Sequence, residues 1–128
     1  MILVDTDVLI AHLRGVAHAY EWLKQTRQSG QLAISALTVT ELTGGMRSAE
    51  RRQVWLLLAS LGVEPVTELV GRRAGELMRH HRHSHPGIGL ADYVIAATAQ
   101  VKGFTLATLN VRHFPMFPDL QAPFRLDG

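Results

Sequence analysis

Three carboxylates in this sequence stand where strands end or helices begin, and their spacing suits the binding of a cation. Asp5 directly follows a short apolar run, Glu41 lies in the helix expected after the next apolar run, and Asp92 begins another expected helix. Mg²⁺ takes oxygen ligands, usually one or two carboxylates with waters and phosphate oxygens. We therefore predict a Mg²⁺ site in which Asp5 and Asp92 bind directly and Glu41 binds directly or through water.

Such a site suits the cleavage of a phosphodiester, because Mg²⁺ can polarise and orient a phosphate and lower the pKa of a bound water. Thr6, Thr108 and Asn110 would then offer hydrogen bonds to the carboxylates or to phosphate oxygens. The same three residues are equally typical of turns and helix caps. The sequence leaves both roles open for them.

Each carboxylate also has a purely structural interpretation. Thr38 and Glu41 match a capping box, in which Thr38 caps a helix and Glu41 bonds back to it. Asp92 in a first helical turn is favourable through the helix dipole alone. Asp7 is interpreted as the N-cap of the first helix. What favours a cation site is the joint placement of Asp5, Glu41 and Asp92, which no single cap explains.

The elements that must position these residues alternate along the chain. The apolar runs predict strands at Ile2–Val4, Leu32–Ile34, Val63–Val66 and Phe104–Ala107. Periodicity and glycine or proline stops predict helices at Asp7–Leu13, Ala17–Gln28, Thr38 to about Gly44, Ala49–Leu61, Thr67–His83 and Leu90–Val101. Strands separated by helices predict an α/β fold, with a parallel sheet covered by helices on both faces. The sheet has four strands, or five if Phe124–Leu126 forms an edge strand.

The composition sets the frame of a single domain over residues 1–128. The chain has no cysteine, which excludes a disulfide framework and agrees with a cytoplasmic location. The longest apolar stretch is too short to span a bilayer, so we expect no membrane segment. Asp5 and Asp7 interrupt the N-terminal apolar run, so we expect no signal peptide.

The basic residues lean toward an anionic partner. The net charge is only +2, but the pI is about 9.5. Arg72, Arg79 and Arg82 lie with several histidines in or near one long helix, which predicts an RNA-facing stripe. Arg14 and Arg47 are further candidates for contact with RNA or an acidic partner.

Two further groups have alternative interpretations. His81 and His85 are four residues apart, which also allows a metal site, although no third ligand is evident. The helix segment Val54–Leu58 is apolar almost all round, which indicates deep burial or a subunit contact.

Four blocks of this sequence together resemble a known family. They are Val4-Asp5-Thr6-Asp7-Val8-Leu9-Ile10, Thr40-Glu41-Leu42 with Gly44-Gly45, Ala91-Asp92-Tyr93-Val94-Ile95-Ala96-Ala97-Thr98-Ala99, and Leu106-Ala107-Thr108-Leu109-Asn110 with His113-Phe114. In this order and spacing they resemble PIN domains, and more closely the VapC toxins of bacterial toxin–antitoxin pairs. The resemblance implies a PIN-like three-layer sandwich and an endoribonuclease that depends on Mg²⁺ or Mn²⁺. It also implies a VapB-type antitoxin partner and a homodimer, and it places the family's acidic residues at Asp5, Glu41 and Asp92.

The sequence departs from the family pattern at one position. Many relatives have Asp or Glu where this chain has His113, directly before Phe114. Imidazole suits Mn²⁺ and Zn²⁺ better than Mg²⁺. We therefore expect three carboxylates to hold one metal ion, with His113 at most near the rim of the site.

Three other classes of protein share some of these features. An aspartyl-phosphate phosphatase also carries Asp-x-Asp after a strand, but Leu9 stands where Thr or Val is usual, and the chain has no suitably placed Lys. A receiver domain would need an aspartate after the third strand, and residues 63–67 supply none. A catalytically weak RNA- or protein-binding module with a PIN-like fold is the third alternative.

Overall fold

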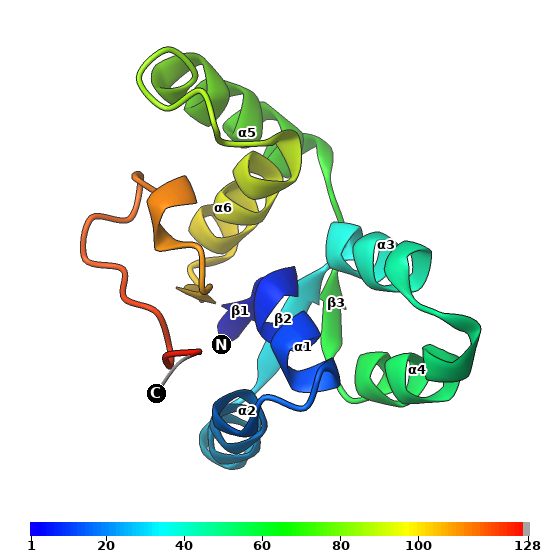
Figure 1. The fold of residues 1–128 in the computed structure, drawn as a ribbon. Coiled ribbons are helices and arrows are strands. Elements are labelled where there is room, and N and C mark those ends of the chain that lie inside the picture. Colours follow the sequence, from blue (N-terminus) through cyan, green and yellow to red (C-terminus); the bar gives the residue numbers. More distant parts are fainter. Residues whose placement is uncertain (127–128) are drawn as a thin grey trace.

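The computed structural model describes residues 1–126 as a parallel sheet of four strands between layers of helices (Figure 1). The strands are β1 (Ile2–Val4), β2 (Leu32–Ser35), β3 (Gly62–Glu64) and β4 (Thr105–Ala107), in the order β3-β2-β1-β4. The helices are α1 (Thr6–Leu13), α2 (Ala17–Ser29), α3 (Ala36–Gly45), α4 (Arg51–Ala59), α5 (Glu68–His81) and α6 (Leu90–Lys102). Short 3₁₀ turns η1 (Ser48–Glu50) and η2 (Val111–His113) precede α4 and follow β4. The predicted α/β sandwich is confirmed.

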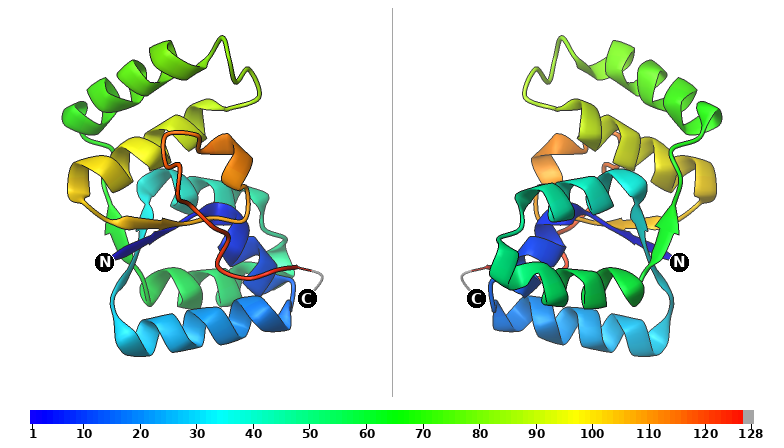
Figure 2. Two further views of the ribbon diagram at one scale, coloured as in Figure 1. Left: turned by 90° about the vertical axis from the view of Figure 1, so that its left-hand side faces the viewer. Right: turned by 90° about the vertical axis from the view of Figure 1, so that its right-hand side faces the viewer.

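The two faces of the sheet carry separate hydrophobic cores because successive side chains of a strand point to opposite faces. Leu3 belongs to the core shared with α5 and α6, whereas Val4 belongs to the core shared with α1, α2 and α4. Figure 2 shows these two helix layers on opposite sides of the sheet. Burial on both faces explains why the inner strands β1 and β2 are apolar runs without alternation, whereas the edge strand β3 is partly exposed.

The register of the sheet brings the carboxyl ends of three strands together. Val4 pairs with Ala107, and Leu3 pairs with Ala33 and Leu106, so that β1 lies between β2 and β4. The backbone N–H of Asp5 donates to the carbonyl of Ala107 over 2.9 Å. The residues that follow β1, β2 and β4 therefore meet at one edge.

Two predicted helix starts were wrong because the chain passes from strand to helix with no intervening loop. Asp5, not Asp7, is the N-cap of α1, since Asp5 has an extended backbone and its side chain accepts the Thr6 N–H. Ser35, not Thr38, caps α3, and its hydroxyl oxygen accepts the Leu37 N–H over 3.1 Å. The side chains of Asp7 and Thr38, which were assigned to caps from the sequence, therefore make other contacts.

Other elements differ from their predicted bounds. The third strand begins at Gly62 rather than Val63 and ends at Glu64. The predicted edge strand at 124–126 does not form, because Phe124 packs against the second core and lies tilted on Trp22, with ring centroids 6.4 Å apart. Gly103 caps α6 in the left-handed conformation, as predicted.

Helix α4 has one buried and one exposed apolar face. Val54, Leu57 and Leu58 are buried against the sheet. Trp55 and Leu56 are 49% and 63% exposed. The segment thus combines the two predicted alternatives, since part of it forms the core and part remains available on the surface. Within residues 1–126 no helix is long and apolar enough to cross a membrane.

We predict that Phe114→Ala destabilises the protein by about 3–5 kcal/mol, the usual cost of truncating a buried aromatic ring. Phe114 is 1% exposed and anchors the segment after η2 in the core of α5 and α6. Urea unfolding measures the loss. The matched control is Leu69→Ala, because Leu69 is 62% exposed. Equal stability of the two variants would show that Phe114 does not anchor this segment.

Candidate active site

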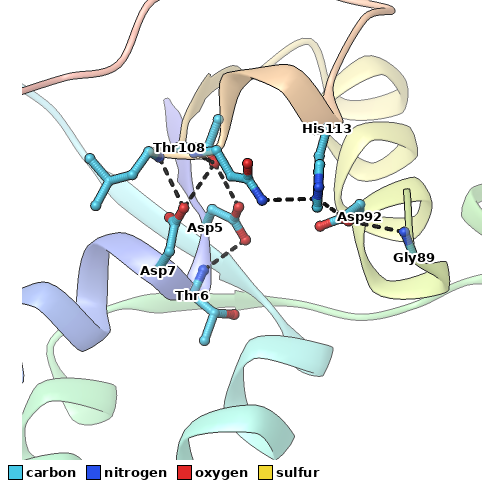
Figure 3. Close-up of polar contacts among 9 residues, drawn as sticks. Asp5, Thr6, Asp7, Gly89, Asp92, Thr108 and His113 are labelled. Atoms are coloured by element: carbon cyan, nitrogen blue, oxygen red, sulfur yellow. Dashed lines mark hydrogen bonds and ion pairs between the residues drawn. The ribbon is translucent and has the colours of Figure 1, made fainter. Parts of the chain in front are cut away.

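Asp5 stands at the centre of a carboxylate cluster at the carboxyl edge of the sheet (Figure 3). Its side chain is almost fully buried, with 7% of the residue exposed. Oδ1 accepts the Thr6 N–H over 2.8 Å, and Oδ2 accepts the Thr108 hydroxyl over 2.7 Å. Thr6 is the first residue of α1, and Thr108 is the residue directly after β4.

Asp7 lies beside Asp5 and shares its partner Thr108. Oδ2 of Asp7 accepts the Leu109 N–H over 3.1 Å and lies 3.3 Å from the Thr108 hydroxyl. Oδ1 is buried and has no hydrogen-bond partner within the described residues. Asp7 therefore joins α1 to the segment after β4. It belongs to the cluster itself, which the sequence interpretation as an N-cap missed.

Glu41 reaches the cluster through a hydroxyl on α1. Thr6 Oγ1 lies 2.7 Å from Glu41 Oε1 and 3.0 Å from the buried Thr38 Oγ1. A hydroxyl carries one hydrogen, so Thr6 donates to the Glu41 carboxylate and accepts from Thr38. The predicted capping box between Thr38 and Glu41 was therefore wrong. Thr38 instead supports the hydroxyl that positions Glu41.

Asp92 stands at the start of α6 and is held from two sides. Oδ2 accepts the Gly89 N–H over 3.1 Å and lies 3.0 Å from His113 Nδ1. The contact with Gly89 gives Asp92 a structural role in the first turn of α6, as the sequence allowed. The second places His113 against Asp92 itself, closer than the rim position that we expected.

Asn110 completes this side of the cluster. Its amide nitrogen Nδ2 lies 2.9 Å from His113 Nδ1, and its backbone N–H donates to Thr108 Oγ1 over 3.0 Å. His113 Nδ1 can donate its proton to Asp92 only when Asn110 presents its amide oxygen to the ring, since an amide N–H needs an acceptor. Thr108, Asn110 and His113 thus form one support that runs from Asp5 to Asp92.

The cluster raises the pKa of two carboxyl groups. Burial, and then the neighbouring charge of Asp7, raise the pKa of Asp5 to about 7, although the bonds from Thr108 and Thr6 oppose this. Burial likewise raises the pKa of Asp7. Desolvation disfavours the charged form of an acid, and a like charge adds to that cost. The site therefore holds more negative charge than the protein alone neutralises.

The donor set fits a hard divalent cation, although the carboxylates are not preassembled around one position. Among residues 1–126 no Lys or Arg forms an ion pair with Asp5, Asp7, Glu41 or Asp92. The same residues contain no group of three His, Asp or Glu side chains arranged to hold a metal ion. A bound cation would give the unpartnered oxygen of Asp7 a partner and would lower the raised pKa of Asp5.

The predicted basic residues are divided between two places outside the cluster. Arg72 pairs with Glu68 on the exposed face of α5, and Arg79 lies in the last turn of that helix, followed by Arg82 as its C-cap. Helix α5 lies outside α6 (Figure 1), so these residues are not part of the carboxylate cluster. Arg14 and Arg47 instead line a cavity together with Glu41.

The histidines near the end of α5 pack edge to face on one another. The ring centroids of His81 and His85 are 5.7 Å apart, and those of His80 and His81 are 4.6 Å apart. No metal-binding group forms from them within the described part of the chain. The alternative of a metal site at His81 and His85 gains no third ligand from the fold.

The sheet, its two helix layers and the acidic edge define an α/β protein of the PIN type, and comparison with known proteins agrees. The model of the PIN domain family matches residues 2–117. The chain therefore belongs to the PIN domain family.

Similar proteins narrow this assignment to the VapC group. The chain is 62% identical over its full length to "Ribonuclease VapC10" of Mycobacterium tuberculosis, of which it covers 96%. It is 43% identical to "Ribonuclease VapC19" of the same organism, covering 97% of this chain and all of that protein. A toxin–antitoxin complex from Klebsiella pneumoniae contains a chain with a TM-score of 0.82 and 25% identity, covering 98% of this chain and 99% of that one.

We predict that the raised pKa of Asp5 makes the metal-free protein less stable as the pH rises. The folded pKa of about 7 exceeds the ordinary value of 3.8, so the folded state binds a proton that the unfolded state releases between these values. This contribution to stability is complete below about pH 4 and is lost as the pH passes about 7. Asp5→Asn removes the dependence, so the advantage of the variant over wild type grows across this range.

Urea unfolding in EDTA, from about pH 4 to about pH 8, measures the difference. Asp119→Asn is the control, because Asp119 is an exposed aspartate outside the cluster. A constant difference between Asp5→Asn and wild type at every pH would mean that Asp5 titrates normally.

Proposed function

We propose that this protein is a Mg²⁺-dependent endoribonuclease, with Mn²⁺ as a substitute, and that it acts as the toxin of a VapBC pair. The observation that carries the proposal is the pair formed by the buried Asp5 and the partly buried Asp7, which share Thr108 and have no cationic partner within residues 1–126. Asp92 and Glu41 lie at the same edge. The name ribonuclease, printed for the relative with 62% identity, supports RNA as the substrate.

Each residue of the cluster has a role in this proposal. Asp5 and Asp92 would hold the metal ion, and Glu41 would bind it directly or through water. The bound ion would neutralise charge on the scissile phosphate and supply a nucleophilic water at neutral pH. Thr108 and Thr6 position Asp5 and Glu41 by the hydrogen bonds described above, and His113 positions Asp92. Asp7 keeps α1 attached to the segment that carries Thr108.

The geometry is unfavourable for the alternative of an Asp-x-Asp phosphatase. In that mechanism the first aspartate attacks phosphorus, so one of its oxygens must face the substrate. Each oxygen of Asp5 accepts one hydrogen bond in a buried position, which leaves a lone pair for a metal ion but no open approach for attack on phosphorus. The cleavage test below distinguishes a ribonuclease from a binding module that does not catalyse a reaction.

We further propose that a VapB-type antitoxin silences the protein, that the core unit is a homodimer, and that both act in the cytoplasm. The solved relatives include VapBC-1 from nontypeable Haemophilus influenzae, with 26% identity and a TM-score of 0.77 over the full length of both chains. The exposed apolar side chains Trp55 and Leu56 on α4 are surface that a partner could cover.

We predict that Asp5→Asn and Asp92→Asn each reduce RNA cleavage by at least about two orders of magnitude, because each removes a charge from the metal-binding edge. The measurement uses total RNA with Mg²⁺ or Mn²⁺, and EDTA as the metal-free arm. Both variants keep the native circular dichroism spectrum. Lys24→Ala, on the outer face of α2, is the matched control and cleaves like wild type. Near-wild-type cleavage by either Asn variant would disprove the assignment.

A second prediction concerns the partners. Expressed alone, the protein arrests growth, and co-expression with the small protein encoded beside it relieves the arrest and yields a complex that co-purifies. The Asp5→Asn variant also co-purifies but does not arrest growth, which separates binding from catalysis. Light scattering at micromolar concentration gives the mass of a dimer. A monomer under these conditions would contradict the proposed core unit.

A further inference from the structure

The cavity lined by Arg14, Arg47 and Glu41 adjoins the carboxylate cluster and has no role in the chemistry proposed so far. It has a volume of about 360 Å³ and lies between α1, α3 and the start of α4. Ile10, Leu13, Leu42, Met46 and Val54 give it an apolar lining. Leu42 and Val54 are buried, so the apolar floor is part of the fixed core rather than a mobile surface. A preformed apolar cavity with a few polar groups at its rim is the usual form of a small-ligand site.

The cavity is continuous with the candidate active site through Glu41. This residue contributes to the wall of the cavity. Its Oε1 atom also accepts the hydroxyl of Thr6, whose backbone N–H donates to Asp5. A molecule in the cavity is therefore separated from the carboxylate cluster by a single side chain. The cavity therefore lies beside the edge at which RNA would bind under the proposed function.

Two arginines at the rim favour an anionic backbone there. Arg14 directly follows α1, and Arg47 precedes η1; both are exposed and both line the cavity. Neither forms a salt bridge with any residue in the range 1–126, whereas Arg72 and Arg73 on α5 are paired with glutamates. Guanidinium groups bind phosphate in a bidentate manner. Arg14 and Arg47 are therefore available for the phosphates on either side of a nucleotide.

Glu50 gives the cavity a hydrogen-bond acceptor. It is half-buried and lines the same space. Its Oε1 atom accepts the backbone N–H of Arg47 over 2.8 Å, which fixes the carboxylate, and Oε2 makes no hydrogen bond within the described residues. A carboxylate accepts from the exocyclic amino group of a base such as cytosine. The glutamate would repel a bare phosphate inside the cavity but would accept a base that carries an amino group.

We infer that this cavity binds one unpaired, amino-bearing nucleobase of the RNA, next to the phosphodiester that is cleaved. Arg14 and Arg47 contact the adjoining phosphates, and Glu50 accepts from the amino group of the base. Proteins read single-stranded RNA in this way, by taking a splayed base into a pocket and bonding its edge. The inference rests on the proposed function for its substrate, and it assigns sequence preference to a place outside the carboxylate cluster.

Two neighbouring glycines provide a matched test. Gly45 lines the cavity and Gly44 does not, and a Cβ atom added at either position meets no atom within 4 Å. Gly45→Phe should fill the cavity, and Gly44→Phe should leave it open. Both substitutions lie in α3, where glycine is the weaker helix former, so both variants keep their fold. Equal melting temperatures verify this before the comparison.

The first measurement is sequencing of the fragments released from a random single-stranded RNA pool. Wild type and Gly44→Phe share a preference for an amino-bearing base beside the cleaved bond. Gly45→Phe loses the preference and raises KM about tenfold, with a smaller change in kcat, since one base contact discriminates by about that factor. Glu50→Gln keeps the cavity open but changes which base is preferred. Identical fragments from Gly44→Phe and Gly45→Phe would overturn the inference.

The second measurement does not depend on cleavage. RNA containing 6-thioguanosine is photo-crosslinked to Asp5→Asn protein, and the attached peptide is identified by mass spectrometry. We expect the crosslink within residues 10–14 or 42–54, and we expect Gly45→Phe added to Asp5→Asn to abolish it. If this crosslink forms but wild type cleaves no RNA, the base site stands and the proposed ribonuclease activity fails. The base site would be refuted by crosslinks that are confined to α5. It would also be refuted if only a protein partner displaced the RNA.

Discussion

The structure depends on the burial of one carboxylate at the end of the central strand. Asp5 stands where β1 becomes α1, and the hydroxyl of Thr108 reaches it from the segment after β4. A buried carboxylate needs hydrogen bonds or a cation. Thr6 and Thr108 meet part of this requirement, and Asp7 beside them increases it. The acidic edge is thus an arrangement that the protein alone satisfies incompletely, which is the property expected of a cation site.

The surrounding residues hold the other acids relative to this one. Thr6 is the centre of the arrangement, because its backbone contacts Asp5 and its hydroxyl contacts Glu41. On the other side, Thr108, Asn110 and His113 connect Asp5 to Asp92 by side-chain and backbone bonds. Each support is a hydroxyl, an amide, an imidazole or a backbone group, and none is a lysine or arginine. The negative charge of the edge is consequently preserved rather than cancelled by lysine or arginine.

The sequence predicted the sheet and the meeting of the acids, because buried parallel strands are apolar runs and their carboxyl ends share an edge. It did not predict the N-caps of α1 and α3 correctly. Asp5 and Asp7 are both suitable N-caps, as are Ser35 and Thr38, and only the lack of a loop after each strand decides between them. The contact of His113 with Asp92 was also missed, since it depends on how η2 packs through Phe114. Phe124 was predicted to lie in an edge strand because an apolar residue is typical of a strand. It is equally suited to packing on Trp22, which is what the structure shows.

The central position of β1 has a consequence for how the protein is made. The first residues of the chain form the strand between β2 and β4, and β4 begins at Thr105. A chain emerging from the ribosome can pair β1 with β2 but leaves the other edge of β1 open until β4 is synthesised. Asp5 then lacks Thr108, and Asp7 lacks the Leu109 N–H. The acidic edge is completed only after β4 and Thr108 have been synthesised, so a growing chain cannot carry the finished site before these residues emerge.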